Sequence, residues 1–253
     1  MLISNPTNEA PFSNSPEGES TPEHAEAIQE DAGKKKGKKD KAGSKQTVAL
    51  VVIVDRSGSM NGIHHDMEGG IASFLQELKN TQGAKTSVTL AQFDDQYELV
   101  YSARPIEQLE PYRLVPRGST ALHDAMGRTI AMVRAGLGEP GSKQYPQRVL
   151  ALIVTDGMEN ASREWNLRSV RNLIGATKSE GWEYVFLAAN QDAFEEGSKF
   201  GLARHETVNF QASAEDVGEV MVYASDKLSR IMQGAAPESL PDRETWKRDQ
   251  AKP

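Results

Sequence analysis

The chain has 253 residues, a net charge of −7, 38% hydrophobic residues and no cysteine. This length suits one α/β core of roughly 200 residues with tails, and the lack of cysteine excludes disulfides and thiolate metal ligands and fits a reducing compartment. The first residues lack the basic start of a secretory signal, and the longest apolar run, residues 48–54, is too short to span a membrane, so we expect a cytoplasmic protein.

The first 45 residues separate into an acidic and a basic segment. Residues 1–33 carry seven acidic side chains and no Lys or Arg, whereas residues 34–45 carry seven lysines and one aspartate. Few apolar residues are available to offset the entropy of ordering, so we expect residues 1–45 to be disordered. The run from Lys34 to Lys45 could bind nucleic acid or an anionic membrane weakly, but it lacks aromatic residues for base stacking, and a solvated linker is the simpler interpretation.

From residue 47 the sequence alternates between strand and helix patterns. Residues 47–55 are continuously apolar and β-branched, which is typical of a strand covered on both faces. Residues 63–78 carry apolar side chains at spacings of three and four, which predicts a helix. Residues 86–94 and 97–103 are strands too close together for a crossover, so we expect a hairpin that adds one antiparallel edge strand.

The alternation continues to residue 233. We predict helices near 121–136, 166–180, 192–200 and 214–233, and strands at 148–156, 183–190 and 206–210. This order predicts an α/β fold with three layers: a doubly wound, mostly parallel sheet with helices on both faces. We therefore divide the chain into a charged tail at 1–45, a domain at 46–234 and a polar C-terminal tail at 235–253, where Trp246 could dock on the domain or on a partner.

Acidic and hydroxyl side chains follow two of the predicted strands. Asp55, Ser57 and Ser59 come after the first, and Asp156 ends the strand at 148–156. Ligands of open α/β sheets gather at the carboxyl ends of the strands. Alternation in an extended turn would point the three residues after the first strand to one side. Carboxylates and hydroxyls, without sulfur or imidazole, suit Mg²⁺, Mn²⁺ or Ca²⁺ rather than zinc or copper.

Three motifs resemble the metal loops of von Willebrand factor A domains, in the same order and at similar spacing. They are DRSGSM at 55–60, GSTALHDA at 118–125 and VTDG at 154–157. Together they resemble the metal-ion-dependent adhesion site of that family, which combines Asp-x-Ser-x-Ser, a separate Thr, and an Asp before Gly. The resemblance covers about 47–233, and FLAANQDAFEEG resembles the small stand-alone bacterial or phage members.

This resemblance implies a site with an open coordination position. Ser57, Ser59 and Thr120 would be direct hydroxyl ligands, and Asp55 and Asp156 would act largely through metal-bound water. An Asp or Glu of a partner protein would complete the coordination. Thr120 would change its coordination if the domain switches between states. Relatives often act as adaptors, so an ATPase-associated complex is a candidate partner.

The roles of several neighbouring residues stay open at this stage. Asp124, one helical turn after Thr120, could orient a metal-bound water, or could simply be an acid that complements the helix dipole. Asn160 and Ser162 fit capping of the helix that begins near 166 better than metal binding. Arg56 and Met60 fall outside the ligand alternation, so we expect them at the rim of the site, where they could contact a partner.

Two functions of different classes remain. The first is a non-enzymatic, divalent-cation-dependent protein-binding module. The alternative is a metal-dependent hydrolase or phosphatase with Asp55 as nucleophile. Asp55 lacks the second carboxylate two residues later that phosphoryl-transfer aspartates usually have, and no Gly-x-x-x-x-Gly-Lys loop is present. The sequence therefore favours the binding module.

Overall fold

The computed structural model describes residues 45–189 and 192–252, so the predicted disorder of residues 1–45 lies almost wholly outside the described part of the chain. A six-stranded sheet with the order β3-β2-β1-β4-β5-β6 forms the centre. Its strands are β1 (Gln46–Asp55), β2 (Ala84–Phe93), β3 (Tyr97–Pro105), β4 (Arg148–Thr155), β5 (Trp182–Ala189) and β6 (Thr207–Phe210). All neighbouring strands are parallel except β3, which pairs antiparallel with β2 at one edge. The predicted fold class is confirmed.

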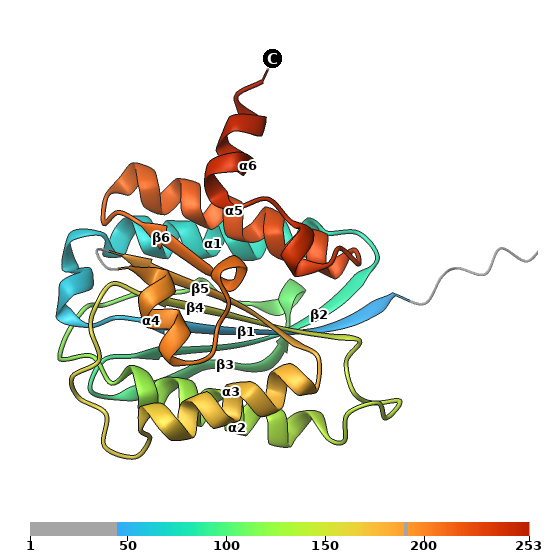
Figure 1. Cartoon of the computed structure of the whole chain (residues 1–253), viewed down its shortest axis with the longest axis horizontal. Coiled ribbons are helices and arrows are strands. Elements are labelled where there is room, and N and C mark those ends of the chain that lie inside the picture. The colour runs from blue at the N-terminus through green and yellow to red at the C-terminus, as the bar shows by residue number, and fades with distance from the viewer. Residues whose placement is uncertain (1–44, 190–191, 253) are drawn as a thin grey trace, which may run out of the picture. The chain divides into compact units, whose positions relative to one another are not determined.

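Helices cover both faces of this sheet (Figure 1). The helices α1 (His64–Asn80) and α5 (Ala214–Met232) lie on one face, and α2 (Leu122–Leu137) and α3 (Leu167–Ser179) lie on the other. The short helix α4 (Ala193–Lys199) follows β5, and α6 (Arg243–Gln250) ends the described chain. Four 3₁₀ turns complete the described elements, at Gly58–Gly62, Ile106–Gln108, Arg204–Glu206 and Pro237–Ser239. Among the described residues, no helix is both long and apolar enough to cross a membrane.

Alternation along β1 divides the core into two halves. Val48, Leu50, Val52 and Val54 pack in the cluster that contains the α1 and α5 side chains, whereas Ala49, Val51 and Ile53 pack in the cluster that contains the α2 and α3 side chains. Each buried aliphatic side chain contributes about 1.5–3 kcal/mol to folding. A shift by one residue would exchange the two sets, so the register of β1 is strongly specified.

That register places the site. Val54 pairs with Val154 of β4, and Asp55 pairs with Phe93 of β2. The carboxyl ends of β1 and β4 therefore lie side by side. The acids that follow these two strands meet at one edge of the sheet.

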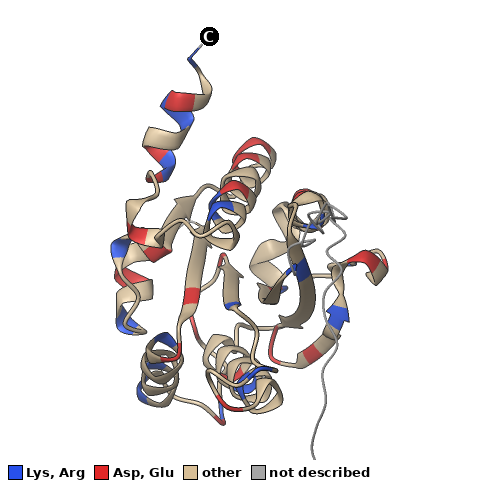
Figure 2. Ribbon diagram, turned by 90° about the vertical axis from the view of Figure 1, so that its right-hand side faces the viewer, with Lys and Arg blue, Asp and Glu red and all other residues tan. Residues whose placement is uncertain are grey.

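The segment after residue 234 contains α6, which packs on the domain. Trp246 is 7% exposed, its ring meets that of Tyr223 edge-on with centroids 5.5 Å apart, and its indole N–H donates to Asp226 at 3.0 Å. Of the two alternatives for Trp246, the structure shows docking on the domain. Charged residues of both signs occur along this helix (Figure 2).

Candidate metal centre

Asp55 links the ends of β1 and β4 from a buried position. Its side chain is fully buried. Oδ1 accepts a hydrogen bond of 2.7 Å from the backbone N–H of Ser57, and Oδ2 accepts one of 2.6 Å from the hydroxyl of Thr155. Both carboxylate oxygens are thus held in place, and the turn after β1 is tied to the end of β4.

Ser57, Ser59 and Asp156 form a continuous polar contact. The two serine Oγ atoms are 3.0 Å apart, and the Ser59 hydroxyl donates to Asp156 Oδ1 at 2.7 Å. The extended turn that we expected here is wrong, because residues Gly58–Gly62 form a 3₁₀ turn. The two serine hydroxyls nevertheless meet, because a tight turn also brings side chains two residues apart into contact, and the Ser59 hydroxyl reaches Asp156.

Thr120 reaches the same point from the loop before α2. A methyl group built on Gly157 would lie 2.8 Å from Thr120 Oγ1, 3.3 Å from Ser59 Oγ and 3.5 Å from Ser57 Oγ. Three hydroxyls from two separate loops therefore surround one small space beside the Asp156 backbone. The structure brings together all five residues that the sequence singled out: Asp55, Ser57, Ser59, Thr120 and Asp156.

The donor set fits a hard divalent cation. All side-chain donors around the space are oxygens, and hydroxyl and carboxylate oxygens suit Mg²⁺, Mn²⁺ or Ca²⁺. Burial raises the pKa of Asp156 to about 6; the hydrogen bond from Ser59 opposes this rise, and the neighbouring Asp55 carboxylate adds to it. Burial also raises the pKa of Asp55, against the hydrogen bonds from Thr155 and Ser57. A cation bound between these two acids would compensate their buried charge.

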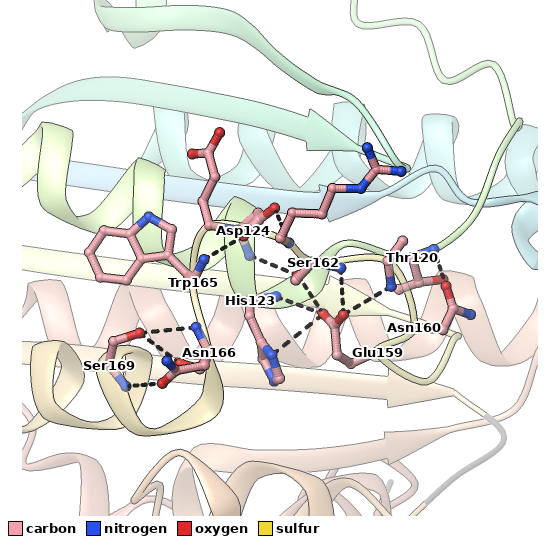
Figure 3. Close-up of polar contacts among 12 residues, drawn as sticks. Thr120, His123, Asp124, Glu159, Asn160, Ser162, Trp165, Asn166 and Ser169 are labelled. Atoms are coloured by element: carbon pink, nitrogen blue, oxygen red, sulfur yellow. Dashed lines mark hydrogen bonds and ion pairs between the residues drawn. The ribbon is translucent and has the colours of Figure 1, made fainter.

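Thr120 is fixed through its backbone to the loop that follows Asp156 (Figure 3). Its N–H donates to Asn160 Oδ1 at 2.9 Å. Its carbonyl accepts from the backbone N–H groups of Asn160 at 3.0 Å and Ala161 at 3.1 Å. The threonine-bearing and aspartate-bearing loops are therefore joined directly. A relative shift of these two loops would break all three hydrogen bonds.

Two acids strengthen this junction from opposite sides. Glu159, in the loop, accepts hydrogen bonds from the His123 N–H at the start of α2 and from the Ser162 hydroxyl. Asp124, in the first turn of α2, accepts from three backbone N–H groups of residues 163–165, at 2.7–2.9 Å. We call these contacts of Glu159 and Asp124, with those of Asn160, the loop clamp. It ties the first turn of α2 to the loop after β4.

The clamp revises two of the sequence interpretations. Asn160 and Ser162 bracket the start of α2, not the helix at 167, whose capping box is formed by Asn166 and Ser169. Burial alone would raise the pKa of Asp124, but its three backbone hydrogen bonds outweigh burial and hold that pKa below its usual range. The described contacts of Asp124 are to the loop, and a role toward a metal-bound water stays a prediction.

An ion-pair cluster beside the site, buried at Arg56 and Asp94, has no counterpart in the sequence analysis. Arg56 is 4% exposed, its Nε lies 3.2 Å from Asp94 Oδ2, and its Nη1 pairs with Glu98. Arg117 Nε also pairs with Asp94 Oδ2, at 2.5 Å. The rim position that we expected for Arg56 is wrong, and so is that of Met60, which is fully buried. The available signal was that Asp94 directly follows β2, as Asp156 directly follows β4.

These ion pairs position the loop that carries Thr120. Asp94 pairs with both Arg56 and Arg117. Two backbone hydrogen bonds also join the turn after β1 to the loop before α2. The Arg117 N–H donates to the Arg56 carbonyl at 2.9 Å, and the Gly58 N–H donates to the Gly118 carbonyl at 3.2 Å. The loop before α2 is thereby held against the turn after β1. The Ser57, Ser59 and Thr120 hydroxyls stay within reach of one another because of this contact.

Comparison with known proteins gives matches to solved structures only. No family model matches the sequence, and no curated protein sequence does. The pilus adhesin SpaC from Lactobacillus rhamnosus GG matches with a TM-score of 0.57 at 13% identity, over 74% of this chain and 31% of that one. The PilB minor pilin from Streptococcus sanguinis matches at 0.54 and 13% identity, over 80% and 65%.

A third match bears on the metal motif. Proximal thread matrix protein 1 from the mussel byssus, with a zinc-occupied MIDAS motif (metal-ion-dependent adhesion site), matches with a TM-score of 0.52 at 13% identity, over 74% of this chain and 46% of that one. What these proteins share with the chain is the fold. The match covers less than two thirds of each of these three structures.

Proposed function

We propose that this domain is a divalent-cation-dependent protein-binding module. Ser57, Ser59, Thr120 and Asp156 would hold Mg²⁺, or Mn²⁺ or Ca²⁺, with Asp55 supporting them, and an Asp or Glu of a partner protein would supply the remaining ligand. The observation that carries this proposal is the convergence of three hydroxyls on the space beside Gly157. When bound, the cation would supply the positive charge that attracts a carboxylate.

The chemistry of the site supports capture of an acid from outside. The three direct ligands would be neutral hydroxyls and the two carboxylates would act largely through water, so a bound dication would still attract an acid from outside. The two most exposed large apolar side chains among the described residues also lie in the loops of this site. Met158, which follows Gly157, is 69% exposed, and Val115, five residues before Thr120, is 67% exposed. These two side chains would add apolar contacts with a partner protein.

The structural neighbours are consistent with this proposal. Two of them are named as a pilus adhesin and a minor pilin, and a third has a metal in a MIDAS motif. Their low identity means that they support the fold directly and the binding function only by analogy. The link to an ATPase-associated complex rests on the family resemblance and stays a prediction.

The phosphatase alternative has no favourable observation among the described contacts. A nucleophilic carboxylate must reach the substrate. The Asp55 side chain is fully buried, and both of its oxygens accept hydrogen bonds. Hydrolysis of a generic phosphate ester that is lost in an Asp55→Asn variant would reverse our preference.

The proposal is tested with the double variant Ser57→Ala and Ser59→Ala in the full chain. Mn²⁺ binding is measured by electron paramagnetic resonance, and Mg²⁺-dependent retention is measured on an array of peptides that contain Asp or Glu, beside matched peptides with Asn or Gln. We expect wild-type protein to bind Mn²⁺ and to retain only acidic peptides, and we expect the double variant to do neither while its circular dichroism is unchanged. Ser102→Ala, at an exposed position on β3, is the matched control.

Two results would contradict the proposal. The first is Mn²⁺ binding that is the same in the wild type and the double variant, which would place the metal elsewhere. The second is peptide retention that persists in the presence of a chelator. Metal binding without retention of any acidic peptide would support the metal site but contradict the capture of a partner's acid.

A further inference from the structure

A second candidate site lies beside β6, the outermost strand on the side of the sheet away from β3. A cavity of about 590 Å³ opens beside β6, bounded by the 3₁₀ turn Arg204–Glu206, by α5 and by the start of α6. This volume is in the usual range for small-molecule sites. Two nearly buried cations, Lys227 of α5 and Arg243 of α6, line it.

Lys227 is a buried ammonium group without a counter-ion among the described residues. Its side chain is 3% exposed. Nζ donates to the His205 carbonyl at 2.6 Å, lies 3.5 Å from the Tyr223 hydroxyl and lies 5.7 Å from the centroid of the Tyr223 ring, so its described partners are all uncharged. Burial lowers the pKa of Lys227, and the charges of Glu206 and Asp242 oppose that effect from a distance. A buried cation of this kind is stabilised by an anion that the cavity could admit.

Arg243 adds an unused donor to the same cavity. It is 9% exposed, and its terminal nitrogens contact Asp216, Glu219 and the Asn209 carbonyl. Within the described part of the chain, Arg243 Nε is the buried side-chain polar atom without a hydrogen-bond partner. The charge of Arg243 is therefore compensated by acids, but its Nε–H group donates to no described acceptor.

Three acids also line the cavity, Asp192, Asp242 and Glu244, and the first two accept hydrogen bonds at the starts of helices. Asp192 accepts hydrogen bonds from the N–H groups of Phe194 and Glu195 at the start of α4. Asp242 accepts from the Thr245 N–H at the start of α6. Neither of them pairs with Lys227 among the described ion pairs. Between them, apolar surface is provided by four side chains: Phe194, Val208, Tyr223 and Leu240.

We propose that this cavity binds an organic monocarboxylate. The carboxylate would lie between Lys227 Nζ and Arg243 Nε, and the apolar part of the ligand would pack on the ring of Tyr223 and its neighbours. A carboxylate with an apolar body matches a cavity in which buried donors lie beside apolar side chains, whereas inorganic phosphate would leave that apolar surface uncovered. The ligand is either a small free acid or the C-terminal carboxylate of another chain. This site uses none of the metal ligands and is independent of the proposed function.

The test compares a carboxylate with its uncharged amide in the full chain. Hydrocinnamate, hydrocinnamide and inorganic phosphate are titrated by isothermal calorimetry. A short peptide is tested both with a free and with an amidated C-terminus. We expect hydrocinnamate or the free peptide to bind with a Kd on the order of 1 mM or below. The matched amide should bind at least about tenfold more weakly, since it cannot form the charge-assisted hydrogen bonds.

Variants then locate the binding. Lys227→Met should abolish it while the Mn²⁺ signal stays unchanged, and Lys85→Met, at an exposed position on β2, should bind as the wild type does. The metal-site double variant should also bind the carboxylate normally. Preference for the small acid or for the peptide identifies the source of the carboxylate, and either supports the proposal.

Three outcomes would overturn it: no saturable binding of either carboxylate up to ~10 mM, equal binding of acid and amide, or tighter binding of phosphate. If Lys227→Met does not fold, the comparison of acid and amide in the wild-type chain decides the matter alone.

Discussion

Substitution of Gly157 by alanine should remove metal binding while the fold persists. The added methyl group would lie in the space that the three hydroxyls surround, 2.8 Å from Thr120 Oγ1 and 3.3 Å from Ser59 Oγ. A carbon atom and an oxygen atom rarely approach within 3.0 Å, so Thr120 must move, and the loop clamp resists that movement. A cation that demands oxygens at about 2.0–2.1 Å could then no longer be held by all three hydroxyls.

The expected magnitudes separate the two effects. In the wild type, Mg²⁺ at about tenfold its dissociation constant adds RT ln 11, about 1.4 kcal/mol, to the free energy of unfolding. For a domain of this size, that corresponds to a rise in melting temperature of about 2–4 °C. Without metal, overpacking in the variant costs about 1–3 kcal/mol, and the reduced entropy of the unfolded chain returns about 0.4–1 kcal/mol.

The assay is thermal unfolding followed by circular dichroism, in a Mg²⁺ series and with chelator. The matched control is Gly175→Ala on the exposed face of α3, where an added methyl group meets nothing within 4 Å. The control should keep the full Mg²⁺ shift and gain about 0.5–1 kcal/mol from helix propensity. A Gly157→Ala variant that shows the wild-type shift at the same Mg²⁺ concentrations would refute the assignment of the cation to this space.

Asn160→Ala should leave the Thr120 N–H without an acceptor, at a cost of about 1–3 kcal/mol, and should lower Mg²⁺ affinity in the same melting assay; unchanged affinity would show that the clamp does not position Thr120. Thr155→Val keeps the side-chain shape but removes the donor to Asp55 Oδ2, so urea unfolding should show a loss of about 1–3 kcal/mol, and a loss below ~0.5 kcal/mol would contradict the hydrogen bond. Because burial lowers the pKa of Lys227 in the folded state, the unfolded chain binds its proton more readily, and stability should rise as the pH approaches the unfolded value of 10.5. Urea unfolding at stepwise alkaline pH should show this rise relative to Lys227→Met, and parallel profiles would contradict it.

The strands and helices could be predicted because their signals are local. The strand predicted at 47–55 has an uninterrupted apolar centre because both faces of β1 are covered. In the structure this strand begins one residue earlier, at Gln46. β2 begins at Ala84, earlier than its apolar run, because Ala84 and Lys85 pair with the polar residues Gln46 and Thr47 of β1. Backbone pairing thus continues beyond the buried side chains. The start of β2 therefore cannot be predicted from the hydrophobic pattern.

The positions of Asp55, Ser57, Ser59 and Asp156 were predictable for the same reason, whereas Thr120, in the loop before α2, came only from the family resemblance. Hydroxyls and acids that directly follow buried strands must lie at the carboxyl edge of the sheet, wherever the rest of the chain goes. The contacts that support them were not predictable. Arg56 looks like a solvated turn residue until Asp94, from another strand, is placed beside it. Glu159 and Asp124 hold backbone N–H groups about 40 residues away in the chain, and no spacing in the sequence records such a pair.

The C-terminal helix also has a consequence for the outermost strand. β6 is the last strand of the sheet, and Arg243 of α6 donates to the Asn209 carbonyl on it at 2.9 Å. Uncovered strand edges are templates on which other chains add strands and aggregate. A fragment that ends at residue 234, where the apolar pattern of the domain stops, would lose α6 and its contact with β6. It would keep every metal ligand and yet be prone to self-association through β6.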